Sequence, residues 1–459
     1  MMVSRAPVWR TACFAREASR RKGRLFLTRR APSGTLRANV VRSRLAPWLL
    51  APCGALFAFL ALSTPRADAR TASDSAVPTS GSAKAAASAT PAPRARQTQP
   101  LQALGEMTLD PARGRYVARY GSGRAVLSVS PSLQQGLEKL LAEFRVPMGA
   151  VVLLDPRTGR VLALAEHAER DHTAQGPIAL RAIAPAASVF KIVTSAALLQ
   201  RGLTPDSEVC FHGGKHRIQK ALLTDNPRRD RRCLTLASAL GKSANVVFAK
   251  LAGRGLSSEQ LRAEANQFLF NSEIPFGWPV EPSPAAVSDD PFDLATTAAG
   301  FGPVRLSPLH GALIAAIVAN RGTLVPPRII DGVEGAALPQ PAESRQVVSR
   351  DVAAALTRMM RTTTTEGTAR KVFGRDRWNR RSPLNDVAVA GKTGSLSDRE
   401  PFRDYSWFVG FAPADNPQIA VSAVVVNERL WRIKAPFVAR EALLAYFASE
   451  AERTRTAAR

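Results

Sequence analysis

An α+β fold is predicted by the order in which strand-like and helix-like apolar patterns follow one another along the chain. Residues 149–166 contain two apolar runs around a Pro-Arg-Thr-Gly turn, which is typical of a β-hairpin. Helical patterns fill the middle of the chain, and strand-like runs followed by a last helix close it. Because the strands fall near both ends of this region, we expect them to complete one sheet beside helices.

Length and composition permit this fold and restrict the partners. The chain has 459 residues and is 45% hydrophobic, which is enough for a large core. Its net charge is +26, but nearly half of the excess lies in residues 1–44, where Glu17 is the single acid. Elsewhere arginine is spread among acids without interleaved aromatic residues. We therefore expect no nucleic-acid partner, and we leave open an arginine-rich composition or attraction to an anionic envelope polymer.

The N-terminal sequence indicates export. After the basic arm of residues 1–44, residues 45–63 carry no charge and are about long enough to cross the ~30 Å hydrocarbon core as a helix. Basic residues on the N-terminal side predict that this side stays cytoplasmic. A small-residue site at Ala67-Asp68-Ala69 would suit signal peptidase. The segment is either a plasma-membrane anchor or a cleaved signal, and both place the following residues outside the cytoplasm, in the envelope or periplasm.

Domain limits follow from composition. Residues 64–114 are rich in Ala, Ser and Pro and almost lack large apolar side chains over most of their length, so we expect a disordered tether. Residues 115–450 read as one globular domain, and residues 451–459 as a C-terminal tail.

Helix signals are clear in three stretches of this domain. Residues 130–144 and 306–322 each open with a serine cap followed by proline, and the second ends in a glycine. Residues 184–202 form a third helical stretch, which starts near Pro185 and ends at a glycine.

Near the C-terminus, three apolar runs predict successive strands, followed by a closing helix. The strand predictions cover residues 386–395, 405–413 and 418–427, and the helix covers residues 435–451.

A lysine inside an otherwise apolar stretch is the first sign of chemistry. Lys191 follows Ser188 by three residues, so both lie on one helix face about 5–6 Å apart at Cβ. A serine hydroxyl is a poor nucleophile unless a base takes its proton. Lysine, with a pKa of ~10.4, becomes a base only where burial or a nearby cation lowers that pKa. Apolar neighbours predict such burial, and free N–H groups in the first helical turn would stabilise an oxyanion.

Two further motifs indicate which chemistry the Ser188 and Lys191 pair performs. Ser243-Ala244-Asn245 and Lys392-Thr393-Gly394, followed by Ser395, lie about 55 and then about 150 residues further along the chain. The order Ser-x-x-Lys, Ser-x-Asn, Lys-Thr-Gly is typical of penicillin-binding proteins and serine β-lactamases. Gly394 would also keep a strand clear for a substrate lying along it.

Two cysteines fall in the exported part. Cys210 and Cys233 lie about two dozen residues apart, and an oxidising compartment permits a disulfide between them. Free thiols remain an alternative, as does a metal site with His212 and His216. The Cys-x-His-x3-His spacing matches no common zinc pattern, so we predict no metal.

Because it carries these three motifs in this order, the sequence resembles the transpeptidase domain of penicillin-binding proteins over roughly residues 124–448. Residues 149–166, 300–327, 366–373 and 390–413 are also similar to that family. The resemblance implies the D,D-peptidase/β-lactamase fold, with an antiparallel five-stranded sheet flanked by helices plus a mostly helical lobe. It implies no cofactor.

The resemblance also implies a role for each motif residue. Ser188 would attack the penultimate D-Ala carbonyl of a stem peptide, form an acyl-enzyme, and use Lys191 as its base. Ser243 would relay a proton to the leaving D-Ala, while Asn245 positions Lys191 and the substrate amide.

The third motif would bind the substrate. Lys392 would lower the pKa of Lys191 and attract the substrate carboxylate, which Thr393 would hydrogen-bond. The backbone N–H groups of Ser188 and Ser395 would form the oxyanion hole.

The implied function is a peptidoglycan D,D-transpeptidase. Its partners would be stem peptides on a lipid-linked precursor or nascent glycan strand, β-lactams as covalent inhibitors, and a glycosyltransferase, since the tether is too short to contain a glycosyltransferase domain. Alternatives on the same fold are a D,D-carboxypeptidase and a β-lactamase, although no glutamate sits in a Glu-x-x-x-Leu-Asn setting among Glu259, Glu264, Glu273 and Glu281. A non-catalytic penicillin-binding sensor or scaffold is an alternative of another class.

Overall fold

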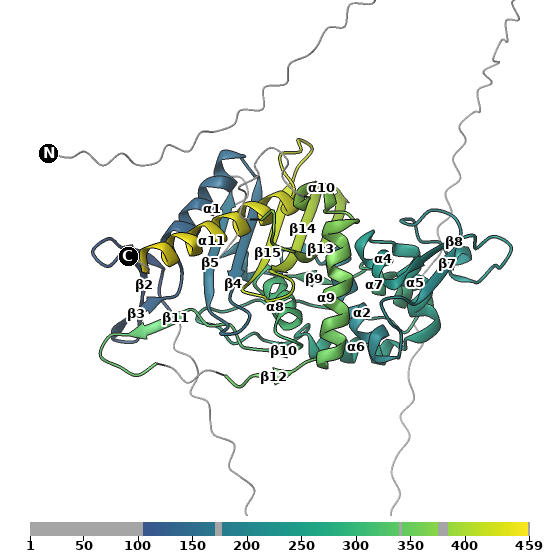
Figure 1. Cartoon of the computed structure of the whole chain (residues 1–459), viewed down its shortest axis with the longest axis horizontal. Coiled ribbons are helices and arrows are strands. Elements are labelled where there is room, and N and C mark those ends of the chain that lie inside the picture. Colours follow the sequence, from purple (N-terminus) through teal and green to yellow (C-terminus); the bar gives the residue numbers. More distant parts are fainter. Residues whose placement is uncertain (1–103, 170–176, 339–341, 375–383, 458–459) are drawn as a thin grey trace, which may run out of the picture. The chain divides into compact units, whose positions relative to one another are not determined.

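The computed structural model describes residues 104–169, 177–338, 342–374 and 384–457. All of them belong to one compact unit, Pro93–Arg459 (Figure 1). The predicted basic arm and apolar segment, and most of the predicted tether, lie outside the described residues. Within the described ranges, no helix is both long and apolar enough to cross a membrane.

One antiparallel sheet of five strands organises the domain, in the order β13-β14-β15-β4-β5. The strands are β4 (Met148–Leu154), β5 (Val161–Ala168), β13 (Ala390–Arg399), β14 (Phe402–Ala412) and β15 (Ile419–Asn427). Every residue of β4 and β15 is buried, because both faces of the sheet are covered by helices. The prediction that strands from the two ends of the domain complete one antiparallel sheet is confirmed, and β13 lies at its edge.

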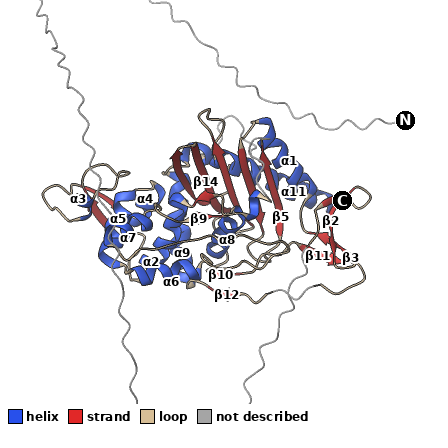
Figure 2. Ribbon diagram, turned by 180° about the vertical axis from the view of Figure 1, so that it is seen from behind, coloured by secondary structure: helices blue, strands red, loops and turns tan. Residues whose placement is uncertain are grey.

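Helices pack on the two faces of this sheet (Figure 2). Helices α1 (Pro131–Glu143) and α11 (Ala435–Ala457) cover one face, and α8 (Pro308–Ala319) covers the other. Neighbouring β15 residues alternate between them, since Val424 and Val426 join the core on the α8 side while Val425 packs with α11. The two-residue period of the strand therefore fills both cores.

A mostly helical lobe lies beside β13, and α9 packs against both β13 and α4 (Figure 1). It contains a short hairpin, β7–β8, and two short segments that precede α2. The elements are β6 (Ala184–Pro185), the 3₁₀ turn η3 (Ala187–Phe190), α2 (Lys191–Gln200), β7 (Glu208–Phe211), α3 (Lys220–Leu223), β8 (Arg232–Thr235), α4 (Leu236–Gly241), α5 (Asn245–Gly255), α6 (Ser258–Gln267), α7 (Pro291–Ala298), α9 (Arg350–Thr365) and α10 (Arg370–Phe373).

Small sheets complete the fold. The largest has the order β1-β2-β3-β11. Its strands, with the remaining short ones and one 3₁₀ turn, are β1 (Thr108–Asp110), β2 (Arg115–Tyr120), β3 (Gly123–Leu127), η2 (Ile178–Leu180), β9 (Arg305–Leu306), β10 (Thr323–Leu324), β11 (Ile330–Val333) and β12 (Arg345–Gln346).

The folded part begins before residue 115. The Leu104 N–H donates to the Gly277 carbonyl at 3.0 Å, and the Gly105 N–H donates to the Arg119 carbonyl at 2.8 Å. These bonds place Leu104 and β1 inside the range predicted as tether, since main-chain pairing holds a segment that has few apolar side chains. At the other end, α11 continues into the predicted tail.

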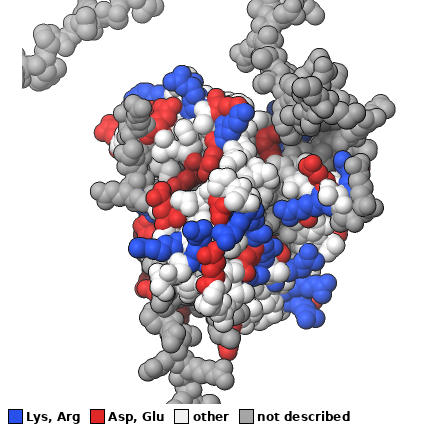
Figure 3. Space-filling view, turned by 90° about the vertical axis from the view of Figure 1, so that its left-hand side faces the viewer, with Lys and Arg blue, Asp and Glu red and all other residues white. Residues whose placement is uncertain are grey.

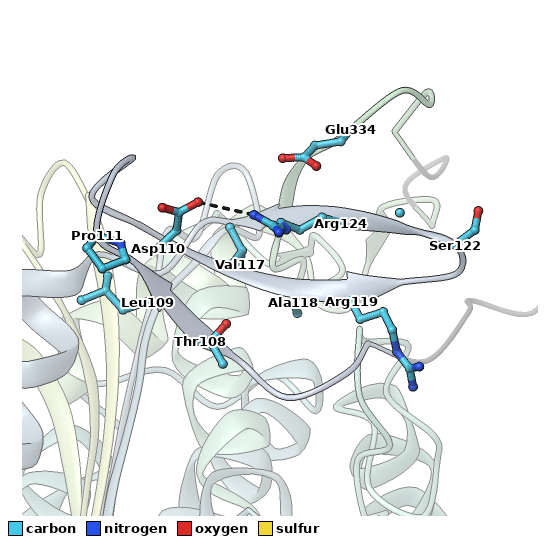
Figure 4. Close-up of a pocket in the computed structure, with 11 residues that line it drawn as sticks. Thr108, Leu109, Asp110, Pro111, Val117, Ala118, Arg119, Ser122, Arg124 and Glu334 are labelled. Carbon is cyan, nitrogen blue, oxygen red and sulfur yellow. Dashed lines mark ion pairs between the residues drawn. The ribbon is translucent and has the colours of Figure 1, made fainter.

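Charges of both signs are mixed on one face of the domain (Figure 3). On the face that Figure 3 shows, Lys and Arg side chains are interspersed with Asp and Glu. A hollow of about 600 Å³ beside β1 and β2 has the same character. There the Asp110 carboxylate faces Arg124, 3.6 Å away, with Glu334 nearby (Figure 4). Because acids balance its arginines, this hollow carries no field that would favour one ligand charge.

The prediction of one helix over residues 184–202 is wrong at its start. Pro185 lies in β6, and Ser188 lies in the 3₁₀ turn η3 rather than in the first turn of α2. Ala187 has a φ of 47°, a left-handed conformation that an α-helix does not contain. This left-handed residue prevents a continuous α-helix from Pro185, and the 3₁₀ turn η3 lies between it and the α-helix that begins at Lys191.

Candidate active site

Two contacts hold the turn that carries Ser188. The Ala187 carbonyl packs against Gly300, where a Cβ would lie 2.3 Å from the Ala187 oxygen, so only glycine fits. Trp407 on β14 donates its indole N–H to the Pro185 carbonyl at 2.9 Å. The strained turn before Ser188 is therefore held from the helical side and from the sheet.

Lys191 has its ammonium nitrogen 2.8 Å from the Ser188 hydroxyl oxygen. The side chain is fully buried, and its other two partners are the Asn245 side-chain oxygen at 2.8 Å and the Ala299 carbonyl at 2.5 Å. A neutral amine has two N–H donors and one lone pair. With Asn245 and Ala299 accepting both hydrogens, the lone pair is left to face Ser188.

The surroundings favour the neutral amine. Burial, together with the nearby charge of Lys392, lowers the pKa of Lys191 well below its ordinary value. The Phe248 ring lies 5.7 Å from the ammonium and favours the charged form, but this contribution is smaller than the desolvation of a fully buried amine.

Ser243 lies at the end of a helix in a left-handed conformation. Its N–H donates to the Leu240 carbonyl, and the next N–H, of Ala244, donates to Ala239. These two bonds form a Schellman motif, with Ser243 at a φ of 52° where glycine is usual. The Lys392 ammonium donates to the Ser243 hydroxyl at 3.1 Å.

Asn245 opens α5 two residues later, and its amide is oriented by a loop. The Asn245 side-chain nitrogen donates to the His216 carbonyl at 2.8 Å, which turns the oxygen toward Lys191. The Val246 N–H holds the same loop through the Lys215 carbonyl at 3.2 Å. Sequence reasoning missed the acceptors at His216 and Ala299, because a backbone carbonyl leaves no trace in residue type.

Lys392 enters from the opposite wall. It lies on edge strand β13, is fully buried, and also donates to the Thr393 carbonyl at 2.7 Å. Burial lowers the pKa of Lys392 to about 7. The described part of the chain places no carboxylate in ion-pair distance of Lys191 or Lys392.

Gly394 lets β13 approach η3. A Cβ there would lie 3.1 Å from the Trp407 Cβ, 3.2 Å from a Val189 methyl and 3.3 Å from the Ala186 carbonyl. The glycine is thus explained by protein packing as well as by the room for substrate that the sequence suggests. The contact brings Ser395 on β13 next to the turn that carries Ser188.

One further hydroxyl lies at this site. Thr393 is hydrogen-bonded to Thr368 with 2.6 Å between the two hydroxyl oxygens. Thr368 follows α9, inside the stretch 366–373 whose similarity to penicillin-binding proteins was visible in the sequence, yet no role was assigned to it.

Cys210 and Cys233 make no contact with Ser188, Lys191 or Lys392 among the hydrogen bonds of the described residues. Cys210 and Cys233 form a disulfide between the paired strands β7 and β8. His212 pairs instead with Asp230. Across the described residues, no group of three potential ligands is placed to hold a metal.

The chain is similar in sequence to known proteins. The family model described as penicillin binding protein transpeptidase domain matches residues 149–443. A peptidoglycan D,D-transpeptidase PbpA of Mycolicibacterium smegmatis is 28% identical, covering 60% of this chain and 61% of its own length. The PbpA of Mycobacterium tuberculosis is also 28% identical, over 68% of this chain and 70% of that relative. The chain thus spans about two thirds of these relatives.

Solved structures agree with this result. The crystal structure of PBPA from Mycobacterium tuberculosis superposes with a TM-score of 0.55 at 26% identity, over 70% of this chain and 80% of that one. An imipenem acyl-enzyme complex of penicillin-binding protein A from the same organism matches equally, with a TM-score of 0.55 at 26% identity, over 70% of this chain and 78% of that one.

Proposed function

The chain belongs to the penicillin-binding protein transpeptidase family, and we propose that it cross-links peptidoglycan stem peptides as a serine D,D-transpeptidase. The observation that carries the proposal is the 2.8 Å contact between a fully buried lysine and the Ser188 hydroxyl. Among the described residues no acid lies in ion-pair distance of Lys191, and its two other contacts are acceptors, so a lone pair is available to take the hydroxyl proton.

Acylation then follows from the positions of the side chains. As the Ser188 hydroxyl oxygen bonds to the penultimate D-Ala carbonyl carbon, its proton moves to Lys191. The N–H groups of Ser188 and Ser395 stabilise the oxyanion. When the peptide C–N bond breaks, the leaving D-Ala nitrogen takes a proton delivered through Ser243, which Lys392 orients at 3.1 Å.

Deacylation completes the transfer. The amine of a second stem peptide attacks the acyl ester, loses a proton to the Lys191 and Ser243 pair, and the ester C–O bond breaks to restore the Ser188 hydroxyl. Lys392 and Thr393 hold the terminal carboxylate of the donor during acylation. In a carboxypeptidase, water would take the place of the amine.

The β-lactamase alternative lacks a water-activating glutamate in this geometry. Glu264 is the buried one of the four candidates, and burial raises its pKa to about 7. Its carboxyl accepts a hydrogen bond from Gln200 at 2.6 Å. Gln200 ends the helix that Lys191 begins, so the residue that Glu264 contacts lies roughly 13 Å along the helix axis from Lys191.

Location and partners extend the proposal. The relatives' names place them in peptidoglycan synthesis, which supports a location in the cell envelope with the domain outside the cytoplasm. Stem peptides carried by a lipid-linked precursor or nascent glycan strand are the substrates, and a separate glycosyltransferase supplies the strand.

Labelling with a fluorescent penicillin tests the nucleophile. The full chain should be labelled covalently, and Ser188→Ala should abolish the label, whereas Ser397→Ala, an exposed serine on the same strand as Lys392, should not. Label that survives Ser188→Ala would place the nucleophile elsewhere.

A second assay separates transfer from hydrolysis. The chain is incubated with a pentapeptide stem, with and without an amine acceptor. A cross-linked product is expected with the acceptor. Release of D-Ala at the same rate in both samples, without a cross-linked product, would favour the carboxypeptidase, and rapid loss of the penicilloyl adduct would favour the β-lactamase.

A further inference from the structure

We infer that Thr368 is a positioning residue for recognition of the donor carboxylate, acting through the hydroxyl of Thr393. This inference rests on the proposed function, and it assigns a part to the segment between α9 and α10. Among the described residues Thr368 makes no hydrogen bond to Ser188 or Lys191, so its effect has to pass through Thr393.

Thr368 connects the helical lobe to strand β13. Its N–H donates to the Gly241 carbonyl at 3.0 Å, two residues before Ser243. Its hydroxyl meets Thr393 on β13. Gly367 makes this approach possible, because a Cβ there would lie 2.1 Å from the Gly241 oxygen. The backbone of Thr368 is therefore held at the end of α4, and its side chain reaches Thr393 on β13.

The hydroxyl protons decide the direction of the bond. Each threonine has one O–H donor. The Thr368 oxygen lies 2.6 Å from the Thr393 oxygen but 3.4 Å from the Gly241 carbonyl, so its proton is placed better on Thr393. When Thr368 donates, Thr393 has its own proton free for an anion.

The substrate carboxylate completes the chain. Thr368 is exposed and Thr393 is half-buried, so a ligand can reach this end of the pair. A chain from the Thr368 O–H through the Thr393 O–H to a carboxylate strengthens each bond by polarisation, and the last bond is charge-assisted. Without the Thr368 hydroxyl, Thr393 loses the donor that sets its orientation.

The test compares two ligands that differ only in this charge. Benzylpenicillin and its methyl ester compete against a fluorescent penicillin for acylation of the full chain. Thr368→Val should lower the acylation efficiency of the acid about tenfold and that of the ester less than twofold. Thr368→Ser keeps the hydroxyl and should stay within twofold of the unchanged protein for both ligands.

Matched variants separate positioning from folding. Thr365→Val removes another exposed hydroxyl at the end of α9 and should change neither ligand. In a Thr393→Val background, Thr368→Val should have no further effect, because its partner is already gone. If Thr368→Val does not fold, Thr368→Ala takes its place in the same comparison.

Three results would overturn the inference. Equal losses of acylation efficiency for the acid and the ester in Thr368→Val would indicate a structural role. An unchanged efficiency for the acid would indicate that Thr368 has no role in recognition. A full effect of Thr368→Val in the Thr393→Val background would mean that Thr368 does not act through Thr393. Failure of the unchanged protein to react with penicillin at all is a separate outcome, which would overturn the proposed function and this inference with it.

Discussion

Two regions of this molecule each bury a lysine completely, and they treat it in opposite ways. In the cleft, Lys191 contacts a hydroxyl, an amide oxygen and a carbonyl. Under the β7–β8 hairpin, Lys250 forms ion pairs with Asp225 at 3.0 Å and Asp230 at 2.9 Å, and it donates to the Cys210 carbonyl.

The comparison indicates that the partners of a buried lysine, and not burial alone, determine whether it forms a stabilising ion pair or is suited to act as a base. Burial alone would raise the pKa of Asp230, but hydrogen bonds from Lys250, the Asn226 backbone and His212 hold it far below the ordinary value. Asp230 therefore keeps its charge, and its contacts with Lys250 fasten the β7–β8 pair to α5. Around Lys191 the described residues supply no carboxylate to compensate for the desolvation, so its pKa is lowered, as the proposed role of a base requires.

The largest expected effect is on the chemistry of the cleft. Lys191→Ala should slow acylation by penicillin about 10²–10⁴-fold, since general-base assistance is typically worth that much. The rate is measured by stopped-flow labelling, and thermal unfolding of the same sample checks the fold. Lys139→Ala, on the exposed side of α1, is the control. An unchanged acylation rate in Lys191→Ala would end the assignment of the base.

The matching change in the other region should act on stability. Lys250→Met leaves the buried Asp230 without its cation, and we expect a loss of about 3–5 kcal/mol in the free energy of unfolding by urea. Adding Asp230→Asn should recover part of the loss, because the uncompensated charge disappears. If Lys250→Met unfolds at the same urea concentration as the unchanged protein, the conclusion that the ion pairs of Lys250 stabilise the fold is wrong.

Loss of the disulfide between Cys210 and Cys233 should lower stability while leaving acylation almost unchanged. Replacing Cys210 and Cys233 by serine removes a crosslink over 23 residues, worth roughly 3 kcal/mol in the chain-entropy model. Acylation of the folded fraction should stay within about threefold, because Asn245 keeps its own bond to His216. A large loss of acylation without a loss of stability would show that the hairpin controls the cleft directly.

The smallest effect concerns pH. The pKa of Lys392 is about 7, so its positive charge is present below that pH and is lost as the pH rises through it. Binding of a carboxylate ligand should therefore weaken above pH 7, by at most tenfold per unit, while binding of the methyl ester should not. The apparent affinity of benzylpenicillin and its ester is measured from pH 6 to 9. Parallel curves for the two ligands would contradict this.

The sequence predicted a set of candidate site residues from residue type and spacing. Ser188, Lys191, Ser243, Asn245 and Lys392 came from the order of three motifs, and the structure brings them into one cluster through the contacts among them. The five-stranded sheet followed from apolar runs with a clear period. In both cases the information lies in residue types at fixed spacing.

What escaped prediction depends on the backbone or on distant pairing. The carbonyls of Ala299 and His216 hold the base and its neighbour, and any residue could supply them. The 3₁₀ start before α2 depends on contact with Gly300, more than a hundred residues away. The sheet of β1, β2, β3 and β11 joins short segments from both halves of the chain, and no local pattern marks such a pairing.

The position of β13 at the sheet edge has a consequence for solubility. An unpaired edge invites strands of other molecules, and proteins often protect one with an inward-pointing charge. Lys392 supplies such a charge in the middle of the cleft. A variant that replaces Lys392 with an apolar residue would remove this charge, and the packing of η3 and α9 against β13 would then be the remaining protection of the strand.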